Sequence, residues 1–465
     1  MEFAIVIMAA GKGTRLKSRR PKVLHEIGGC TLVEHVIAAA AQVVAPKDIY
    51  VVIGYEAEQV RSATKYTGVQ FVTQEEQRGT GDAIQATQQA VSDYENLLVL
   101  SGDAPLIRLE TIRKLRDYHL EQQAAMTVLT TRPPDPTGYG RVVRAKDGKP
   151  EVAAIVEQKA LTPEQLSAPE INSGIYAFRC APLFQHIGEL STNNAHGEYY
   201  LTDMAALLTK AGDRVVALET ADVDEVLGAN TIAEMMALDA ALRMRTARAL
   251  MAEGVTIFRP ETSVIDSTVS VGPDTILEPF VQLLGATKIG SDCRIRSYSV
   301  IEDSTLGDHV LIRNGCIVSQ SHIASKALIG PYSHLRPESK VGEGAHVGNF
   351  VETKTTTLGA GAKANHLSYL GNADIGAGTN IGAGTITCNY DGKTKSPTRI
   401  GENVFVGSDS TLVAPIEIGN GSYIAAGSII TEDVPADALA LGRARQTVKP
   451  EWAAKLRAKR GSPVT

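Results

Sequence analysis

At residues 375–386 the sequence reads Ile-Gly-Ala-Gly-Thr-Asn-Ile-Gly-Ala-Gly-Thr-Ile, so that isoleucine stands at position 375 and again six positions later at 381. Aliphatic residues keep the same step further on, at Ile400, Val406, Leu412, Ile418, Ile424 and Ile430. A period of six fits neither a helix nor a simple alternating strand, and it predicts short strands joined by turns. The second half of the chain is therefore expected to be a solenoid.

The same phase can be followed upstream through most of the second half of the chain. It passes through Val271, Leu277, Leu283, Ile289 and Ile295, then Val300, Leu306, Ile312 and Val318, then Ile329, Leu335, Val341 and Val347, and then Leu358, Ala364 and Leu370. Slips fall at 295–300, 318–329 and 370–375, and we interpret them as small insertions, which in solenoids tend to emerge on one face. The longest interruption runs from Cys388 to Arg399.

The hexad pattern, an aliphatic residue followed by glycine and then a small residue, resembles that of the hexapeptide-repeat acyltransferases. The resemblance implies a left-handed parallel β-helix that assembles as a homotrimer. Such a repeat domain is either a scaffold or a catalytic unit, and its polar residues must decide between the two.

Composition limits the classes of protein that remain. A chain of 465 residues is too long for one ordinary core and predicts two domains. The formal net charge of −6 gives no overall basic field, which argues against nucleic acid as a partner. The five cysteines are scattered without a Cys-x-x-Cys spacing, which favours a reducing cytoplasm. The first residues are apolar only as far as Met8, too short for a signal peptide or a membrane span.

The N-terminal run Phe3–Met8 is continuously apolar and opens into a loop with two glycines, Ala-Ala-Gly-Lys-Gly-Thr-Arg at 9–15. This is typical of a buried parallel strand followed by a phosphate-binding turn. A tight turn before a helix would look similar, but the cations Lys12, Arg15 and Lys22 accompany the glycines. The loop is not a Walker loop, because no Gly-Lys-Ser/Thr closes it.

The loop at 9–15 together with Pro-Lys-Val-Leu at 21–24 resembles the signature of the sugar-nucleotide pyrophosphorylases. That resemblance implies an α/β Rossmann-like nucleotidyltransferase domain. The pattern of the sequence agrees with it, since strands are expected at 49–53, 69–72, 96–101 and 126–131, and helices at 32–44 and 81–91.

Two further runs follow expected strands. Gln74 and Gly79-Thr80 could face a nucleotide base or only cap a helix, and the family reads uracil at this place. Asp103 ends the apolar run 97–100, where a doubly wound sheet places a metal ligand, although it could also cap a turn. The resemblance implies Mg²⁺ bound by Asp103 and Asn230. Ser101 departs from the family, which often has an aromatic residue there.

A second group of motifs matches the sugar-binding half of the same family. By position, Gly140, Glu157 and Asn172 would contact the amino sugar. The run 198–203, Glu-Tyr-Tyr-Leu-Thr-Asp, is also similar to the family, but its acidic residue could equally cap a helix beginning near Leu201, and we assign it no catalytic role. The residues that the resemblance implies for UTP or UDP-N-acetylglucosamine are Met8, Ala9, Ala10, Gly11, Arg15, Lys22, Gln74, Gly79, Thr80, Ser101, Gly102, Asp103, Gly140, Glu157, Asn172 and Asn230.

Residues 231–253 are rich in strong helix formers and contain neither glycine nor proline. We read this segment as a rigid helical arm of roughly 35 Å between the domains. The expected organisation is a nucleotidyltransferase domain at 1–230, a helical linker at 231–253, and a β-helix domain with a C-terminal tail at 254–465.

Charged residues and an imidazole interrupt the small-residue pattern of the hexads. They occur in the runs 334–337, 349–354, 364–371 and 387–393. These runs resemble the acetyltransferase half of the bifunctional uridylyltransferase/acetyltransferases of UDP-N-acetylglucosamine synthesis, and with the first domain the resemblance extends from Met8 to Arg443.

The resemblance implies a role for each matching residue. His366 would be the general base, because imidazole takes up a proton near neutral pH, with Glu352 orienting its ring. Arg336, Lys354, Tyr369 and Asn380 would bind glucosamine-1-phosphate. The residues expected to hold acetyl-CoA are Ala383, Asn389, Tyr390, Ser408, Ala426 and Arg443.

Together the motifs imply acetylation of glucosamine-1-phosphate from acetyl-CoA and then uridylyl transfer from UTP to N-acetylglucosamine-1-phosphate, which supplies peptidoglycan and other cell-envelope polymers. Two alternatives remain at this stage. The repeat domain could only trimerise a nucleotidyltransferase, against which His366 and its neighbours argue. The chain could also be a regulatory subunit that pairs the two folds without chemistry, against which the glycine loop and Asp103 argue.

Overall fold

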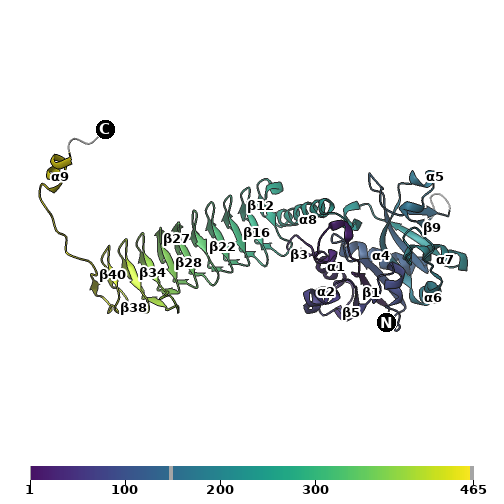
Figure 1. The fold of residues 1–465 in the computed structure, drawn as a ribbon, viewed down its shortest axis with the longest axis horizontal. Coiled ribbons are helices and arrows are strands. Elements are labelled where there is room, and N and C mark those ends of the chain that lie inside the picture. The colour runs from purple at the N-terminus through teal and green to yellow at the C-terminus, as the bar shows by residue number, and fades with distance from the viewer. Residues whose placement is uncertain (1, 146–149, 461–465) are drawn as a thin grey trace. The chain divides into compact units, whose positions relative to one another are not determined.

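A computed structural model describes residues 2–145 and 150–460. The chain divides into two compact units, Met1–Arg245 and Thr246–Thr465. Figure 1 shows a sheet with its helices in the first unit and a stack of short strands in the second.

The first unit is built on a mixed sheet in the order β11-β7-β10-β6-β1-β4-β5, with β8 paired to β10 and β9 paired to β8. Strands β6, β1, β4 and β5 are parallel, whereas β10 runs antiparallel between β6 and β7. The strands are β1 (Phe3–Met8), β4 (Ile49–Ile53), β5 (Gln70–Thr73), β6 (Asn96–Ser101), β7 (Met126–Thr131), β8 (Arg141–Arg144), β9 (Val152–Val156), β10 (Ile171–Arg179) and β11 (Val215–Glu219), and a separate small ribbon pairs β2 (Glu26–Ile27) with β3 (Cys30–Thr31).

Both faces of this sheet are buried, as the continuous apolar runs predict. Along β1, Val6 belongs to one core cluster, whereas Ile5 and Ile7 belong to the cluster on the other side. The helices of the unit are α1 (Leu32–Ala40), α2 (Ala57–Thr64), α3 (Thr80–Gln85), α4 (Leu109–Gln122), α5 (Pro163–Leu166), α6 (Cys180–His186) and α7 (Met204–Ala211).

Most of the expected elements are present, but two helices are shorter than the sequence predicts. The helix expected at 32–44 ends at Ala40, and the one expected at 81–91 begins at Thr80 and ends at Gln85. After Gln85 the hydroxyl of Thr87 donates to the carbonyl oxygen of Ile84 at 2.7 Å. The backbone N–H of Gln88 likewise donates three residues back, to the Gln85 carbonyl at 3.1 Å, so the chain continues in turns after Gln85.

The second unit is a left-handed parallel β-helix of three sheets, which confirms the fold expected from the hexads. From β12 to β37 each strand pairs in parallel with the strand three places further along the chain, and β39 pairs with β41. We call the sheets face one, face two and face three.

Face one holds β12 (Thr256–Ile257), β15 (Ile276–Leu277), β18 (Arg294–Ile295), β21 (Leu311–Ile312), β24 (Leu328–Ile329), β27 (His346–Asn349), β30 (Lys363–His366), β33 (Asn380–Ile381), β36 (Phe405–Val406), β39 (Tyr423–Ile424) and β41 (Leu439–Ala440). Face two holds β13 (Val264–Ile265), β16 (Gln282–Leu284), β19 (Val300–Glu302), β22 (Ile317–Ser319), β25 (His334–Leu335), β28 (Glu352–Lys354), β31 (Tyr369–Gly371), β34 (Ile386–Cys388), β37 (Thr411–Val413) and β40 (Ile429–Ile430). Face three holds β14 (Ser270–Val271), β17 (Lys288–Ile289), β20 (Thr305–Leu306), β23 (His322–Ile323), β26 (Lys340–Val341), β29 (Thr357–Leu358), β32 (Ala373–Ile375), β35 (Thr398–Ile400) and β38 (Ile416–Ile418).

The aliphatic hexad residues point inward and form one continuous core. The expected phase is wrong at Val300, because Ile301 is the fully buried residue and pairs with Leu283. The slips are also not insertions. The step between the inward-pointing residues Ile301 and Leu306 is one residue shorter than six, and other steps from face two to face three are shortened in the same way. A tight turn at Asp303, which has a positive φ of 46°, closes this shorter corner.

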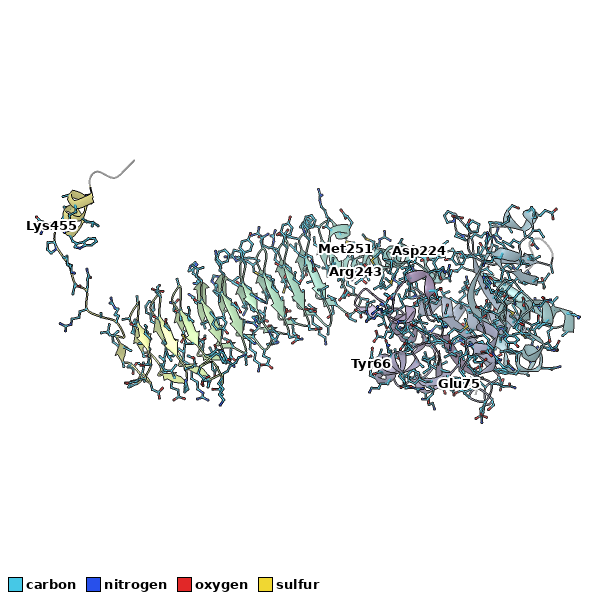
Figure 2. All side chains as sticks on the ribbon, viewed as in Figure 1. Tyr66, Glu75, Asp224, Arg243, Met251 and Lys455 are labelled. Carbon is cyan, nitrogen blue, oxygen red and sulfur yellow. The ribbon has the colours of Figure 1, made fainter. Side chains whose placement is uncertain are left out.

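The segment predicted as a helical linker forms helix α8 (Ile232–Ala252). Met235, Leu238 and Leu242 pack with buried residues of the first unit, and Ala247 and Leu250 belong to the core of the second. Figure 2 labels Arg243, which lies on α8 near the end of the first unit. Arg243 forms an ion pair with Asp239 one turn earlier at 2.9 Å. A last helix, α9 (Trp452–Arg460), lies in the tail, and residues 461–465 lie outside the described residues.

Candidate active sites

A pocket of 630 Å³ opens where the parallel strands of the first unit end. Its wall comes from the loop after β1, from the end of β6, from the start of α3 and from the segment before α8. It is lined by Met8, Ala9, Ala10, Gly11, Lys12, Gly13, Thr14, Arg15, Lys22, Val23, Gln74, Gln77, Gly79, Thr80, Ala83, Ser101, Asp103, Glu198 and Asn230.

The glycine loop is shaped to let Lys22 approach. Gly13 has a φ of +62°, and a Cβ at this position would lie 2.5 Å from the Cβ of Lys22. Any other residue would therefore be strained and would also displace Lys22. Gly102 does not line the pocket, and its backbone N–H donates to the carbonyl oxygen of Met8 at 3.0 Å.

Charges of both signs converge at the floor of the pocket. The ammonium of Lys22 forms an ion pair with Asp103 and donates to the Oδ1 atom of Asn230 at 2.9 Å. Arg15 donates to the same oxygen at 2.6 Å, and the hydroxyl of Ser101 donates to Asp103 Oδ1 at 2.6 Å. Burial raises the pKa of Asp103, but the charge of Lys22 and the hydrogen bonds from Lys22 and Ser101 outweigh it and hold this pKa below its usual range.

The two oxygens suit a magnesium ion. Asp103 and Asn230 are brought together closely enough to share one ammonium, and carboxylate and amide oxygens are the ligand types that Mg²⁺ takes in proteins. The ionised state of Asp103 adds the negative charge that such a ligand needs.

On the other wall, Gln74 is buried and held by its own neighbours. Its side-chain nitrogen donates to the carbonyl of Gly79 at 3.1 Å and to Asp82 at 2.8 Å. The hydroxyl of Thr80 accepts from the backbone N–H of Leu201 at 3.0 Å. These hydrogen bonds hold Gln74 and Thr80 in fixed positions on the pocket wall, where they can contact a planar ring.

The three residues expected at the sugar lie together, although they are not on the wall of the 630 Å³ pocket. The backbone N–H of Asn172 donates to the carbonyl of Gly140 at 2.9 Å, and a Cβ on Gly140 would lie 3.6 Å from the carboxylate of Glu157. Burial, together with the charges of Asp203 and Glu198, raises the pKa of Glu157 against a hydrogen bond from Thr202. Glu198, whose charge contributes to this shift, is itself a residue of the pocket wall.

Glu198 is a pocket residue that the sequence analysis missed. Its run ends at Asp203, for which a helix cap was the alternative. Asp203 does precede α7, but its side chain accepts no capping hydrogen bond from that helix.

In the second unit, candidate residues stack along the corner between faces one and two. Asn349 pairs with His366 in the next coil, and continuation of the printed registers places Ala383, Ser408 and Ala426 in the same column. Hydrogen bonds from Gly384 to the His366 carbonyl and from Asp409 to the Ala383 carbonyl follow this column. Arg443 lies at its far end, with its Cδ 3.9 Å from where a Cβ on Gly427 would be.

Further candidate site residues lie on face two. Glu352 pairs with Tyr369, and Arg336 donates to the Glu352 carboxylate at 2.8 Å. Gly371 leaves room beyond Tyr369, since a Cβ there would lie 2.5 Å from the tyrosine hydroxyl and 2.8 Å from the amide nitrogen of Asn389. Asn389 is buried and donates to the Oδ1 atom of Asn372 at 2.6 Å.

Cations gather at the corner between faces two and three. The registers place Arg336 beside Lys354, and the charge of nearby Lys395 and then that of Arg336 lower the pKa of Lys354. Lys395 arrives from the long interruption, which is a small hairpin in which Tyr390 bridges to Lys395. The sequence analysis missed Lys395, because nothing in its local sequence marks it.

His366 itself is exposed, and its ring has no hydrogen-bond partner within the described residues. Glu352, expected to orient that ring, instead contacts Arg336. Asn380 pairs with Lys363 in the coil before it and with Phe405 in the coil after it, on face one.

The first unit therefore has the loop, the carboxylate and the pocket of a nucleotidyltransferase, and the second has the coils of a hexapeptide-repeat acyltransferase. Family models agree: residues 5–164 match the MobA-like NTP transferase domain, and residues 397–432 match the hexapeptide repeat of succinyl-transferase.

Some relatives match this chain over nearly its whole length, and the match covers both units. The chain is 63% identical to the bifunctional protein GlmU of Koribacter versatilis (strain Ellin345), with 98% of each chain covered. It is 52% identical to that of Solibacter usitatus (strain Ellin6076), over 98% of this chain and 97% of the relative. It is 44% identical to that of Streptococcus agalactiae serotype V (strain ATCC BAA-611 / 2603 V/R), over 97% of each.

The chain belongs to the GlmU family. It is a bifunctional enzyme of UDP-N-acetylglucosamine synthesis, with a uridylyltransferase and an acetyltransferase activity. Within residues 2–145 and 150–460, no helix is both long enough and apolar enough to span a membrane.

Proposed function

We propose that the 630 Å³ pocket binds UTP and that Gly140, Glu157 and Asn172 bind N-acetylglucosamine-1-phosphate. The observation that carries this proposal is the convergence of Arg15, Lys22, Asp103 and Asn230 at the floor of a pocket large enough for a nucleotide.

Uridylyl transfer needs no protein nucleophile, because the sugar phosphate attacks the α-phosphate of UTP and pyrophosphate leaves. The chain has to place the two substrates in line and neutralise the charge that develops. Arg15 and Lys22 supply positive charge, and backbone N–H groups of the glycine loop face the phosphates. Asp103 and Asn230 would hold Mg²⁺, which would neutralise charge on the phosphate oxygens when bound.

For the second activity we propose that glucosamine-1-phosphate lies across face two, with its phosphate at Arg336, Lys354 and Lys395. The crowding of like charges that lowers the pKa of Lys354 supports this assignment, because an anion would relieve it. His366 at the opposite edge would take the proton from the amine as it attacks the thioester of acetyl-CoA. Acetyl-CoA would run along the column that continues through Ala383, Ser408 and Ala426 towards Arg443.

We also propose that the protein works as a homotrimer, and an exposed apolar ridge supports this. The ridge stands on the corner beside His366 and holds its residues at φ values of 50° to 66°, a region that side chains other than glycine rarely adopt. Two pairs of its rings stack, with centroids 5.2 Å and 5.7 Å apart. The ridge consists of Phe280, Tyr298, Tyr332, Phe350 and Leu367, each 47% to 65% exposed.

Such a ridge is costly for an isolated chain, since it combines backbone strain with exposed apolar surface. Contact with other copies of the chain would bury it. Because Leu367 follows His366 directly, a neighbouring copy on this ridge would stand beside the acetyl-transfer site.

The experiment that tests the uridylyl assignment is pyrophosphate release from UTP with N-acetylglucosamine-1-phosphate and Mg²⁺. We expect turnover with this pair and little with CTP or with glucose-1-phosphate. Equal turnover with all of them would contradict the assigned pockets.

The trimer is tested with the double variant Tyr332→Asp/Phe350→Asp. We expect this variant to be a monomer in light scattering, to lose acetyl transfer and to keep uridylyl transfer. A trimer that keeps both activities would refute the ridge as the contact between copies.

A further inference from the structure

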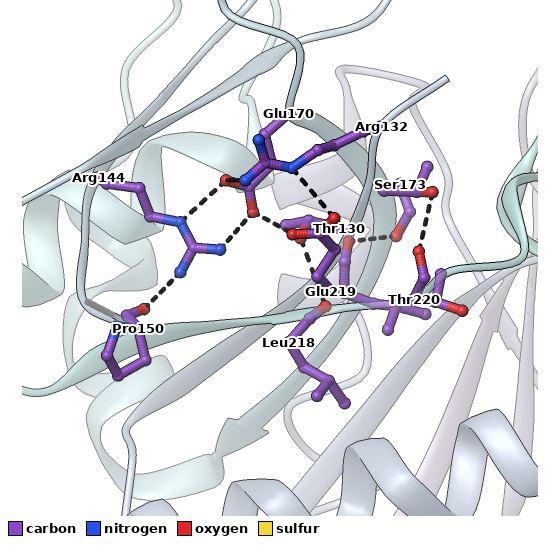
Figure 3. Close-up of polar contacts among 11 residues, drawn as sticks. Thr130, Arg132, Arg144, Pro150, Glu170, Ser173, Leu218, Glu219 and Thr220 are labelled. Atoms are coloured by element: carbon purple, nitrogen blue, oxygen red, sulfur yellow. Dashed lines mark hydrogen bonds and ion pairs between the residues drawn. The ribbon is translucent and has the colours of Figure 1, made fainter. Parts of the chain in front are cut away.

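A buried carboxylate lies behind the proposed sugar site. Glu170 is 5% exposed and accepts hydrogen bonds from two side chains (Figure 3). Arg144 donates to both of its oxygens, to Oε2 at 2.9 Å and to Oε1, and the hydroxyl of Thr130 donates to Oε1 at 2.7 Å. Arg144 also donates to the carbonyl of Pro150 at 3.1 Å.

Neither Glu170 nor Arg144 lines the 630 Å³ pocket, so the pair is not part of its wall. An ion pair taken out of water contributes little net stability, because desolvation offsets the attraction between the charges. What a bidentate arginine–carboxylate pair adds is geometry, since two parallel hydrogen bonds fix the distance and orientation of the strands that carry the groups. Arg144 lies on β8, Thr130 lies on β7, and Glu170 directly precedes β10.

Strand β10 is irregular directly after Glu170. Its pairing with β7 shifts between Asn172 and Tyr176, and Gly174 within the shift has a φ of +77°. The side chain of Asn172 is fixed across this bulge, because its nitrogen donates to the hydroxyl of Tyr176 at 2.8 Å and its oxygen accepts from the Gly174 N–H at 3.1 Å. A bulge re-aims side chains, so the direction of Asn172 depends on how β10 enters it.

The start of β10 pairs with β7 at Ile171–Thr131 and Asn172–Thr130, whereas its contact with β8 on the other side is short. Strand β8 pairs with β10 at a single register position, Arg141 with Ile171. The flanking hydrogen bonds run from the Val142 N–H to the Glu170 carbonyl at 3.1 Å and from the Asn172 N–H to the Gly140 carbonyl at 2.9 Å. The contact between β8 and β10, which brings Gly140 and Asn172 together, is therefore short, and the Arg144–Glu170 pair is the side-chain clamp beside it.

We propose that Glu170 and Arg144 are positioning residues for recognition of the amino sugar. They touch neither substrate, and they fix the β8–β10 contact so that Gly140 and Asn172 meet the sugar at the correct angle. This inference rests on the proposed binding of N-acetylglucosamine-1-phosphate at Gly140, Glu157 and Asn172. It predicts that loss of the clamp weakens sugar binding selectively and leaves the nucleotide side of the pocket intact.

The test uses two variants of the full chain. Glu170→Gln keeps the shape of the side chain and removes its negative charge. Arg144→Lys keeps the positive charge and removes the guanidinium group that bonds to both carboxylate oxygens. The control is Arg132→Gln: Arg132 also approaches Glu170, but at 3.8 Å, and it is half exposed. Steady-state uridylyl transfer gives KM separately for UTP and for N-acetylglucosamine-1-phosphate, and acetyl transfer by the same preparation reports on the second unit. Asn172→Ala is assayed in parallel as a direct test of the sugar site.

We expect both clamp variants to raise the KM for the sugar phosphate by on the order of tenfold or more, the scale of a small misplacement of a binding group. The KM for UTP, acetyl transfer and the Arg132→Gln control should stay within about twofold of the unmodified chain. The double variant Glu170→Gln/Arg144→Lys should be little worse than either single one, because the pair acts as a unit.

Unchanged sugar KM in a folded variant, or an equal rise of both KM values, would overturn the inference. If Glu170→Gln does not fold, Arg144→Lys decides by the same criteria. If Asn172→Ala itself leaves the sugar KM unchanged, the assigned sugar site fails, and that outcome is separate from failure of the clamp alone.

Discussion

His119 provides a prediction for the stability of the first unit. The side chain lies on α4 and is 1% exposed. Its Nδ1 atom is 2.8 Å from the hydroxyl of Thr127, and its Nε2 atom has no hydrogen-bond partner within residues 2–145 and 150–460. Burial, assisted by the charge of Arg179, lowers the pKa of His119 from 6.5 to about 4.

The sign of the effect follows from the direction of the shift. The unfolded chain binds the proton more tightly than the folded chain, so His119 favours folding fully above pH 6.5 and progressively less as the pH falls towards 4. With these two values, the loss of folding free energy between pH 7.5 and pH 5 is about 2 kcal/mol. His119→Asn keeps a hydrogen-bonding group for Thr127 and removes the titration.

Hydrogen exchange of the buried amides of α4 and β7 in the full chain measures this free energy within the first unit. We expect the unmodified chain to lose about 2 kcal/mol more than His119→Asn over this pH range. His322→Asn, a change at an exposed histidine of the second unit, is the control and should follow the unmodified chain. Parallel pH profiles for the unmodified chain and His119→Asn would refute the reasoning.

Three further predictions concern the two activities. Asp103→Ala should abolish pyrophosphate release and leave thiol release from acetyl-CoA largely intact, and equal loss of both in a folded protein would contradict separate sites. His366→Ala should reduce acetyl transfer by roughly 10²-fold or more, the scale of a positioned general base, with uridylyl transfer unchanged; near-normal acetyl transfer would make Glu352 or water the base. Residues 246–465 alone should be trimeric by light scattering and active in acetyl transfer, because the coils supply their own core. A fully active monomer would refute the proposal that a neighbouring copy stands beside the acetyl-transfer site.

The sequence predicted the structure best where a local pattern is compatible with only one type of secondary structure. The apolar run at β1 has its predicted bounds because a strand buried on both faces needs an unbroken apolar sequence, and Asp103 follows β6 as the end of such a strand predicts. The hexads predicted the β-helix because no other regular structure repeats every sixth residue.

Prediction failed where the deciding contact is distant in the chain. Val300 and Ile301 are adjacent aliphatic residues, and only the pairing of Ile301 with Leu283 determines which one points inward. Glu198 and Lys395 reach the sites through tertiary packing and a hairpin, which the local sequence does not reveal. The antiparallel insertion of β10 between β6 and β7, which creates the bulge at Asn172, has no signal in local periodicity.

One chain is expected to perform both transfers in sequence, and a coupled reaction measures this. The full-length protein is incubated with glucosamine-1-phosphate, UTP and Mg²⁺, acetyl-CoA is added, and free thiol and pyrophosphate are followed together. The account predicts no pyrophosphate before acetyl-CoA is added and then thiol release followed, after a lag, by pyrophosphate. Rapid pyrophosphate release without acetyl-CoA, or thiol release that never leads to pyrophosphate, would contradict it.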